Sequence, residues 1–342
     1  MTGQKKIVAG FDIGGAHLKV ARVEDGRVTA AATVAAPLRL GLDTLAAAFR
    51  ETTPIHAGAE LGAFTMTGEL SEAFPSRTAG VAALLDEIAR HFSADSLIYT
   101  TRSGLVAIDQ ARTVPGEVAS ANWHATASLV ARLAGDALFV DMGSTTTDII
   151  AVRDGKVMNE GDSDAGRLAT GELVYTGFVR SFPFALCSNA PVRGRFTPLM
   201  NEYFATMADV HRVLGVLREM DDQHRTADNK EKTLPASITR LARLVGRDAD
   251  DLGTDEWRHI AAWFSEHQLR LIHDTAYLVS GKLADDAPVV GAGIGRWQVE
   301  RLARRLERPF LDLAALIPAE ENARIAASDA APAAAVALLA SC

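Results

Sequence analysis

Three short segments of the chain have residue types that suit the binding of a phosphate group. The first is Asp12-Ile13-Gly14-Gly15, which ends an apolar run that begins at residue 7. Glycines after a strand let the backbone approach an anion, and successive N–H groups then form a concavity for phosphate oxygens, so Gly14 and Gly15 are predicted phosphate contacts. From the strand end Asp12 can hold Mg²⁺ directly or through water, and Lys19 can reach back to the phosphate. The alternative is a hairpin turn with a surface aspartate.

The second segment, Asp141 to Asp148, combines an acid, a glycine and four consecutive hydroxyl residues. Hydroxyl groups can donate to phosphate oxygens beside backbone N–H groups. The alternative is a threonine-rich strand edge, because threonine favours strands. Asp141 is the second predicted Mg²⁺ ligand. The predicted phosphate contacts of this segment are Gly143, Ser144, Thr145 and Thr146.

The third segment is Gly291-Ala292-Gly293-Ile294-Gly295, between an apolar run and a helical pattern. A dinucleotide fingerprint has the spacing G-x-G-x-x-G, and here the third glycine comes one residue early. The chain also lacks a G-x-x-x-x-G-K-[ST] sequence, so it is not a P-loop protein. A glycine turn that enters a helix can still direct the helix N-terminus at an anion, which makes Gly291 and Gly293 predicted phosphate contacts.

The first two segments occupy equivalent points of a repeated strand pattern. A strand, an acidic glycine turn, a second strand, an Asp-Gly hairpin turn and a third strand occur over residues 7–34 and again over 137–160. Such a repeat predicts two similar domains, of residues 1–134 and 135–342. Between about residues 199 and 283 the spacing is helical, which predicts an insertion in the second domain.

Two further segments have a distinct composition. Residues 220–232 are polar and are expected to form a mobile loop or lid. The alanine-rich residues 330–340 are expected to form a helix that packs internally, and the alternative is packing at a dimer interface. The alternation of strands and helices predicts the α/β fold class.

The composition restricts the classes of partner and the cellular compartment that we expect. The chain has 342 residues, of which 48% are hydrophobic, and this length fits two domains. A net charge of -8 argues against binding nucleic acid or an anionic membrane, because both require basic patches. Two cysteines, Cys187 and Cys342, make a disulfide framework improbable and indicate a cytoplasmic protein. The histidines form no zinc-binding pair, and the apolar tracts are too short for a signal peptide or a membrane span. The oligomeric state stays open.

Taken in order, the three segments resemble the phosphate-1, phosphate-2 and adenosine segments of the actin, heat-shock ATPase and sugar-kinase superfamily. The resemblance covers nearly the whole chain and implies two ribonuclease-H-like domains. Five strings more closely resemble a branch of the hydantoinase/oxoprolinase family that is associated with tetrahydromethanopterin-linked one-carbon transfer. They are residues 10–16, 65–70, 121–127, 141–150 and 171–177.

This branch resemblance implies an ether-forming synthase of methanofuran or methylofuran biosynthesis. The implied reaction joins an (aminomethyl)furan-methyl diphosphate to the phenol oxygen of tyrosine, tyramine or a glutamylated form, and pyrophosphate leaves. The implied partners are therefore small diphosphate and phenolic substrates, with Mg²⁺ near Asp12 and Asp141. Because a phenol has a pKa near ~10, a general base would help, and the candidates are Glu69, Asp148 and Glu172.

Asn122 and Trp123 lie in one of the resembling strings and are predicted substrate contacts. For Trp123 the alternative is a packing role inside a helix.

Two other functions remain compatible with the sequence. An ATP-dependent kinase or amidohydrolase would use the same three phosphate-type turns. Ala16 and His17 stand where ATP-using relatives commonly carry Thr or Ser, which argues against the kinase. The other function is a non-catalytic nucleotide-sensing or scaffold protein, against which the retained acidic turn residues argue.

Overall fold

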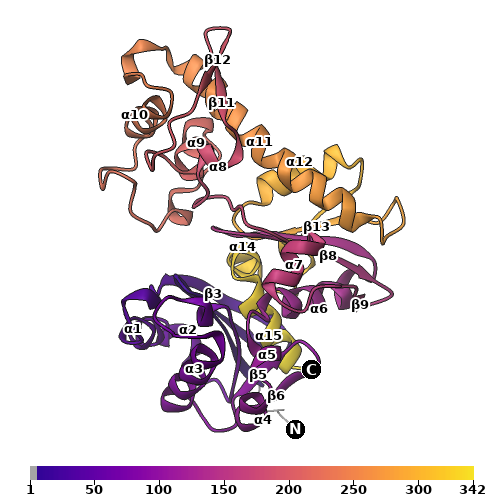
Figure 1. Ribbon diagram of the computed structural model, residues 1–342. Helices are drawn as coiled ribbons and strands as arrows, with labels where there is room; N and C mark the ends of the chain where they lie inside the picture. The colour runs from indigo at the N-terminus through magenta and orange to yellow at the C-terminus, as the bar shows by residue number, and fades with distance from the viewer. Residues whose placement is uncertain (1–5) are drawn as a thin grey trace. The chain divides into compact units, whose positions relative to one another are not determined.

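The computed structural model describes residues 6–342 and divides into two compact units (Figure 1). Unit 1 comprises residues 6–139, 151–158 and 311–342, and unit 2 comprises residues 140–150 and 159–310. The division at residues 134/135 follows the sequence repeat and stays a prediction. The compact units differ from it because the last segment packs into unit 1.

A six-stranded sheet forms the centre of unit 1, in the order β3-β2-β1-β4-β5-β6. Strand β1 pairs antiparallel with β2 and parallel with β4, so the sheet is mixed. The strands are β1 (Ile7–Ile13), β2 (His17–Glu24), β3 (Arg27–Ala35), β4 (Leu61–Met66), β5 (Leu97–Thr100) and β6 (Gly104–Ala107). The helices of this unit are α1 (Asp43–Glu51), α2 (Thr53–His56), α3 (Arg77–His91), α4 (Ile108–Thr113), α5 (Pro115–Val118), α6 (Asn122–Ala134), α13 (Leu313–Leu316), α14 (Arg324–Asp329) and α15 (Ala331–Ala340).

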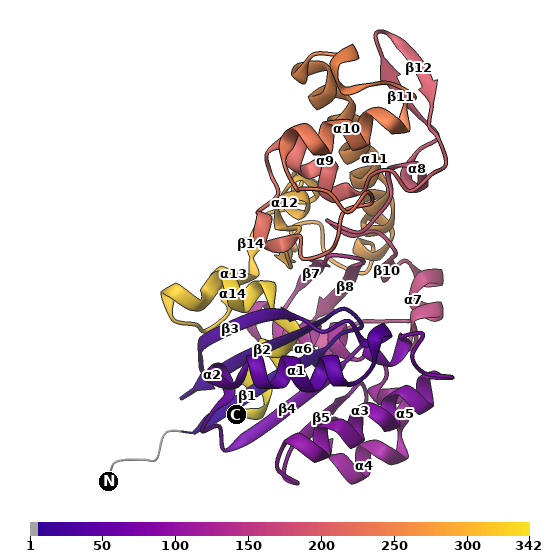
Figure 2. The same ribbon diagram turned by 90° about the vertical axis from the view of Figure 1, so that its left-hand side faces the viewer.

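The alanine-rich helix α15 packs directly on strand β1, beside which it lies in Figure 2. Strand β1 is buried on both faces, as expected for a nearly continuous apolar run. The approach is close because both elements carry small residues. A Cβ atom added at Gly10 would lie 2.0 Å from the carbonyl oxygen of Ala333. The predicted internal packing of this helix is therefore confirmed.

The second sheet has the order β10-β8-β7-β13-β14, and β9 pairs with β8. Its strands are β7 (Ala137–Met142), β8 (Thr147–Arg153), β9 (Lys156–Val157), β10 (Leu173–Val174), β13 (Val289–Ala292) and β14 (Phe310–Asp312). Helices α7 (Asp164–Thr170) and α12 (Arg296–Arg305) belong to unit 2.

The two sheets repeat one plan. In each, the first strand lies between the next strand of its hairpin and a strand that comes later in the chain, β1 between β2 and β4 and β7 between β8 and β13. The hairpins turn at Asp25-Gly26 and at Asp154-Gly155, and all four residues have φ between 49° and 74°. Asp141 follows Asp12 by the same number of residues as Asp154 follows Asp25. The predicted repeat and the predicted fold class, α/β with two ribonuclease-H-like sheets, are confirmed.

The helical insertion of unit 2 begins earlier than the predicted residue 199. It contains α8 (Pro183–Leu186), β11 (Asn189–Val192), β12 (Arg195–Pro198), α9 (Met207–Leu214), α10 (Leu234–Leu244) and α11 (Thr254–Ser280). Ala190 and Val192 of the β11–β12 hairpin pack into the same apolar core as α9, α10 and α11. The hairpin was missed because its apolar residues are few, and their partners are distant in sequence.

Buried arginines hold the predicted mobile segment in place. Arg212 of α9 donates to Asp222 at 2.7 Å, and Arg240 of α10, which is 0% exposed, donates to Asp228 at 3.1 Å. The segment 216–232 is thus anchored to two helices of the insertion. Its mobility stays a prediction.

Within residues 6–342, no single helix combines the length and the apolar composition needed to cross a bilayer. Residues 321–329 and 331–340 pass that test only together, as a pair bent by 111°.

Candidate functional site

The first acidic turn of unit 1 places a carboxylate and an amine side by side. Asp12 and Lys19 are directly opposite in the β1–β2 ladder, and Nζ of Lys19 lies 3.2 Å from Oδ2 of Asp12. Asp12 is 2% exposed. Burial raises the pKa of the Asp12 carboxyl, while the charge and hydrogen bond of Lys19 and a hydrogen bond from Asn122 act in the opposite direction. Lys19 keeps a partly exposed side chain that a ligand can reach.

Helix α6 begins with two further predicted site residues, and only the first of them contacts Asp12. Asn122, the first residue of α6, hydrogen-bonds Asp12, so the structure brings these two predicted residues together. Trp123 is 3% exposed, and its ring lies 5.2 Å from that of His124. Its indole is enclosed within unit 1, which favours the packing alternative over contact with a substrate.

The two glycines of the first turn have different environments. The N–H group of Gly14 donates to the carbonyl of His17 at 2.9 Å, and a Cβ atom at Gly14 would lie 3.0 Å from that oxygen. Gly15 is exposed, and a Cβ atom there would meet nothing within 4 Å. Of the two, Gly15 offers open backbone to an anion, and Gly14 closes the turn.

Glu69 lies next to this turn but is enclosed. It belongs to the 3₁₀ turn Gly68–Leu70 that follows β4, and the N–H group of Thr67 donates to Ile13 at 2.9 Å. The side chain of Glu69 is 0% exposed and accepts a hydrogen bond of 2.7 Å from Ser120. Ser120 adopts a φ of 51°, which is uncommon for serine, so the backbone is strained where it supports this carboxylate.

The second turn repeats the geometry of the first. The N–H group of Gly143 donates to the carbonyl of Thr146 at 3.0 Å, as Gly14 donates to His17. Ser144, Thr145 and Thr146 are all half-buried and follow directly on β7. The structure therefore places the four predicted phosphate contacts of this segment in one tight hairpin, with hydroxyl groups where the first turn has Gly15, Ala16 and His17.

The third glycine segment meets the second turn inside unit 2. Gly293 has a φ of 79°, and a Cβ atom there would lie 2.3 Å from Oδ1 of Asp141. The N–H group of Gly295, the residue before α12, donates to the carbonyl of Met142 at 2.9 Å. Gly293 is thus beside the predicted metal ligand. Gly291, in contrast, lies within β13, where a Cβ atom would clash with the ring of Phe310 at 2.6 Å, so its glycine is explained by packing.

A segment just after β10 supports the hydroxyl turn. A Cβ atom at Gly177 would lie 2.5 Å from the backbone nitrogen of Thr145. The N–H group of Phe178 donates to Gly143 at 2.9 Å, and that of Arg180 donates to Ser144 at 2.8 Å. Residues 177–180 therefore fix the shape of the turn through backbone contacts.

The other two predicted bases are engaged in internal contacts. Asp148 occupies the position that Lys19 has in the first hairpin, and it pairs with the guanidinium of Arg167, which is 2% exposed. Glu172 accepts from the N–H groups of Glu160 and Gly161, each at 2.8 Å. Burial by itself would raise the pKa of Glu172, but these N–H groups together with Lys282 lower it.

Comparison with known proteins assigns the family. The family model described as Hydantoinase/oxoprolinase matches residues 60–307, which is more than half of the chain. The chain belongs to the hydantoinase/oxoprolinase family.

Two curated relatives share one name, (4-{4-[2-(gamma-L-glutamylamino)ethyl]phenoxymethyl}furan-2-yl)methanamine synthase. The protein of Methanocaldococcus jannaschii is 29% identical over 291 residues, which are 84% of this chain and 87% of the relative. The protein of Methanococcus vannielii is 35% identical over 146 residues, which are 42% of this chain and 65% of the relative.

Solved structures with lower sequence identity also align along the chain. Component A of the Acidaminococcus fermentans (R)-2-hydroxyglutaryl-CoA dehydratase has a TM-score of 0.45 at 13% identity and covers 97% of this chain and 96% of its own. A glucokinase of the ROK family from Streptomyces griseus has a TM-score of 0.43 at 14% identity and covers 97% of this chain and 98% of its own.

In this hydantoinase/oxoprolinase family member, Asp12 fits an Mg²⁺ ion. Its Oδ1 atom is buried and has no hydrogen-bond partner among residues 6–342. Over the same residues, no group of three or more His, Cys, Asp or Glu side chains is arranged to hold a metal. Mg²⁺ usually keeps several waters and takes one or two carboxylates plus substrate phosphates, so a single buried carboxylate suffices. The role of Asp141 as a ligand stays a prediction.

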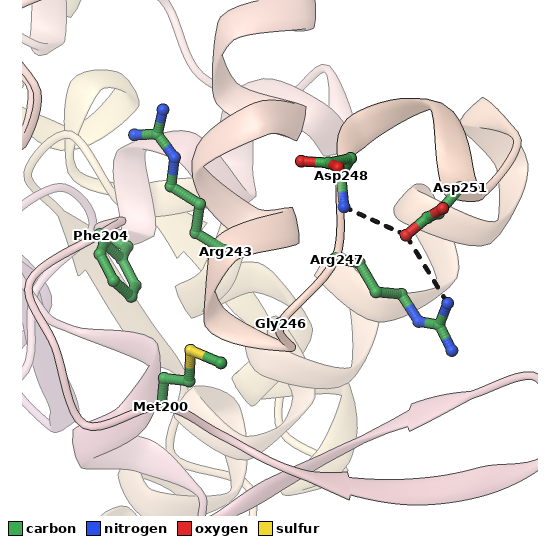
Figure 3. Close-up of a pocket in the computed structure, with 7 residues that line it drawn as sticks. All are labelled: Met200, Phe204, Arg243, Gly246, Arg247, Asp248 and Asp251. Carbon is green, nitrogen blue, oxygen red and sulfur yellow. Dashed lines mark hydrogen bonds and ion pairs between the residues drawn. The ribbon is translucent and has the colours of Figure 1, made fainter.

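A separate cavity of about 290 Å³ lies within the helical insertion (Figure 3). None of the predicted site residues lines it. Two of its charged residues pair with each other, Arg247 with Asp251 at 3.7 Å. The lining residues are Met200, Phe204, Arg243, Gly246, Arg247, Asp248 and Asp251.

The sequence analysis missed one residue of the second turn, Arg180. It is exposed, and its guanidinium lies 3.4 Å from the hydroxyl of Thr145. A lone arginine after the string at residues 171–177 gives no signal by its spacing. Only the fold of the segment around Gly177 places it at the turn.

Proposed function

We propose that this protein is a transferase that joins an (aminomethyl)furan-methyl diphosphate to the phenol oxygen of a tyramine or tyrosine unit, or of its glutamylated form. The names of the two curated relatives support this proposal, since each describes a phenoxymethyl-furan product. In this family member the product would belong to methylofuran biosynthesis.

The reaction breaks the bond between the furfuryl carbon and the bridging oxygen of the diphosphate, and the electron pair leaves with the diphosphate. A lone pair of the phenol oxygen then forms the new ether bond to that carbon. Because the furan ring stabilises positive charge on the methylene carbon, the bond can break before the new one forms. The catalytic demand is therefore neutralisation of charge on the leaving group.

The hydroxyl turn at Ser144–Thr146 is the observation that carries the geometric part of the proposal. It offers hydroxyl donors on a backbone that Gly177 approaches closely. In unit 1, Gly15 and Lys19 offer open backbone and a cation. An Mg²⁺ ion at Asp12 would neutralise charge on an anion bound in unit 1.

We also propose that the departing diphosphate, and not a carboxylate of the protein, takes the phenol proton. The side chains of Glu69 and Glu172 are 0% and 1% exposed, and Asp148 pairs with a buried arginine. None of the three is placed to contact a phenol without leaving these contacts. Glu69→Gln and Glu172→Gln are then expected to keep the pH profile of the reaction. Loss of the acidic limb of the profile in either variant would restore that residue as the base.

Calorimetric titration in the presence of Mg²⁺ tests the function. The protein is expected to bind pyrophosphate and not ATP, and to form the ether from the furan diphosphate and tyramine, as detected by mass spectrometry. Tight ATP binding, with ATP turnover stimulated by a small amide or alcohol, would instead establish an ATP-dependent kinase or amidohydrolase.

A further inference from the structure

A cation and two aromatic rings lie beside the hydroxyl turn of unit 2. The backbone of Arg180 bonds to Ser144 at 2.8 Å, and its guanidinium reaches the hydroxyl of Thr145 at 3.4 Å. Phe182 is 37% exposed and Tyr203 is 49% exposed, and their ring centroids are 5.1 Å apart. Two adjacent exposed rings offer an apolar surface on which a flat ligand can pack.

Arg180 and Phe182 are separated by a single residue, Ser181. Ser181, between Arg180 and Phe182, turns inward, because its hydroxyl oxygen contacts that of Thr176 at 2.9 Å and accepts from the N–H group of Gly177 at 2.8 Å. Its two neighbours are both exposed. The charge of Arg180 also acts on the hydroxyl of Tyr203, so the cation lies near this ring.

Neighbouring residues contact both rings. Phe182 stacks on Phe184 with centroids 5.4 Å apart and an interplanar angle of 5°. Burial and the nearby charge of Asp209 raise the pKa of the Tyr203 hydroxyl, with Arg180 acting in the opposite direction. Tyr203 is therefore a neutral ring at physiological pH, and it does not repel an anion bound at Arg180.

We propose that Arg180, Phe182 and Tyr203 form the recognition site for an arylmethyl diphosphate, in which the guanidinium binds the diphosphate at the Ser144–Thr145 turn and the rings pack on the aryl group. This inference rests on the proposed function and names the residues that select its first substrate. In such a substrate only a methylene and a bridging oxygen separate the ring from phosphorus. Arg180 and Phe182 come from one short segment, so one small ligand can contact both the cation and the ring.

The site also suits the proposed bond cleavage. As the electron pair of the C–O bond moves to the diphosphate, positive charge develops on the arylmethyl carbon and its ring. Aromatic faces stabilise a nearby cation, and a guanidinium stabilises the departing diphosphate, so both charges gain a partner. The site would thus favour diphosphates that carry an aryl group over simple alkyl diphosphates.

Two probe ligands distinguish the contribution of the cation to binding from that of the rings. Binding of furan-2-ylmethyl diphosphate and of methyl diphosphate is measured by calorimetry, with Mg²⁺, on the wild-type protein and on Arg180→Ala and Phe182→Leu. Arg180→Ala is expected to weaken both ligands about tenfold or more, because it removes a charge-assisted contact. Phe182→Leu is expected to weaken only the furan compound, by about fivefold to tenfold. Arg180→Lys should restore part of the affinity, since it keeps the charge.

Matched controls are Arg258→Ala and Phe196→Leu, which change exposed residues of the same unit. Both are expected to bind both probes as the wild type does. Unchanged binding in Arg180→Ala, or an unchanged ratio of the two probes in Phe182→Leu, would overturn the inference even if the wild type forms the ether. Wild-type protein that binds ATP but neither diphosphate would overturn the proposed function itself. Thermal unfolding confirms that each variant is folded.

Discussion

At the scale of single residues, Asp12 carries a charge where burial makes that charge unfavourable. Its pKa is raised by burial, so the folded state binds its proton more tightly than the unfolded state does. The free energy of unfolding should then fall as the pH rises from below the ordinary aspartate value through the raised one. At neutral pH the ionised Asp12 carboxylate therefore still lowers the free energy of unfolding, as is common for groups that have a functional role.

Asp12→Asn should therefore increase the free energy of unfolding at pH 7 while it abolishes Mg²⁺-dependent turnover. Urea unfolding at pH 7 and at pH 4 checks the first part, because the difference from the wild type should shrink at the lower pH. Equal stability of the two proteins at both values would contradict the assigned pKa direction. Asp43→Asn, at the start of α1, serves as a control on the same unit.

Substitution of glycine by alanine is expected to have a large effect at one glycine of the turn regions and a small effect at another. A methyl group at Gly177 would overlap the Thr145 backbone at 2.5 Å, whereas one at Gly15 meets nothing within 4 Å. Neither residue has a positive φ, so space alone decides. Gly177→Ala should cost about 1–3 kcal/mol and most of the diphosphate affinity. Gly15→Ala should leave the stability within about 0.5 kcal/mol.

Thermal unfolding and pyrophosphate titration measure both effects. A Gly177→Ala variant with wild-type affinity would show that the hydroxyl turn does not depend on the segment behind it.

At the scale of elements, Arg240 is one of the two buried arginines that anchor the segment 216–232, and it holds the part around Asp228. Arg240 of α10 is 0% exposed, donates to Asp209 at 2.7 Å and also holds Asp228. Arg240→Met leaves these carboxylates without that partner, and the loss should reach about 3–5 kcal/mol because the contacts are buried. The part of the segment around Asp228 should then detach and expose its trypsin sites, while Arg212 still holds Asp222.

Limited trypsin digestion measures that detachment, because Arg225, Lys230 and Lys232 lie within the segment. Arg243→Met is the matched control. Arg243 also contacts Asp228, but at 3.5 Å and with a side chain 39% exposed, so its removal should change digestion little. Similar digestion of both variants would argue that the segment is mobile in the native protein.

The elements also show what a sequence can and cannot predict. The hairpins at Asp25-Gly26 and Asp154-Gly155 were predictable because turn chemistry is local. The enclosure of Glu69 was not, because it depends on Ser120, which is distant in sequence. Arg180 was missed for the same reason. Residue types indicated which turns can bind phosphate, and tertiary contacts determined which carboxylates stay exposed.

At the scale of the whole molecule, each unit contains a histidine that is kept neutral by burial. Burial lowers the pKa of His124 in unit 1 to about 4 and that of His211 in unit 2 to about 3. In the unfolded chain both titrate near their ordinary value of 6.5. The unfolded state therefore binds more protons below pH 6.5, and stability is lost as the pH falls through that value.

The free energy of unfolding should drop between pH 7 and pH 5, by about 2 kcal/mol for His211 alone. Urea unfolding at several pH values measures the drop. His211→Gln can still donate to the carbonyl of Phe178 that His211 contacts at 2.8 Å, and it should have a shallower pH dependence. An unchanged dependence in this variant would mean that other groups cause the acid sensitivity.

The packing of α15 on β1 has a consequence for how the protein is made. The helix that covers the first strand of unit 1 is encoded more than three hundred residues after it, beyond the whole of unit 2. During translation one apolar face of β1 therefore stays uncovered while unit 2 is synthesised. Such a chain depends on late, long-range closure, and chaperones that shield nascent apolar surface should associate with it until residues 331–340 have left the ribosome.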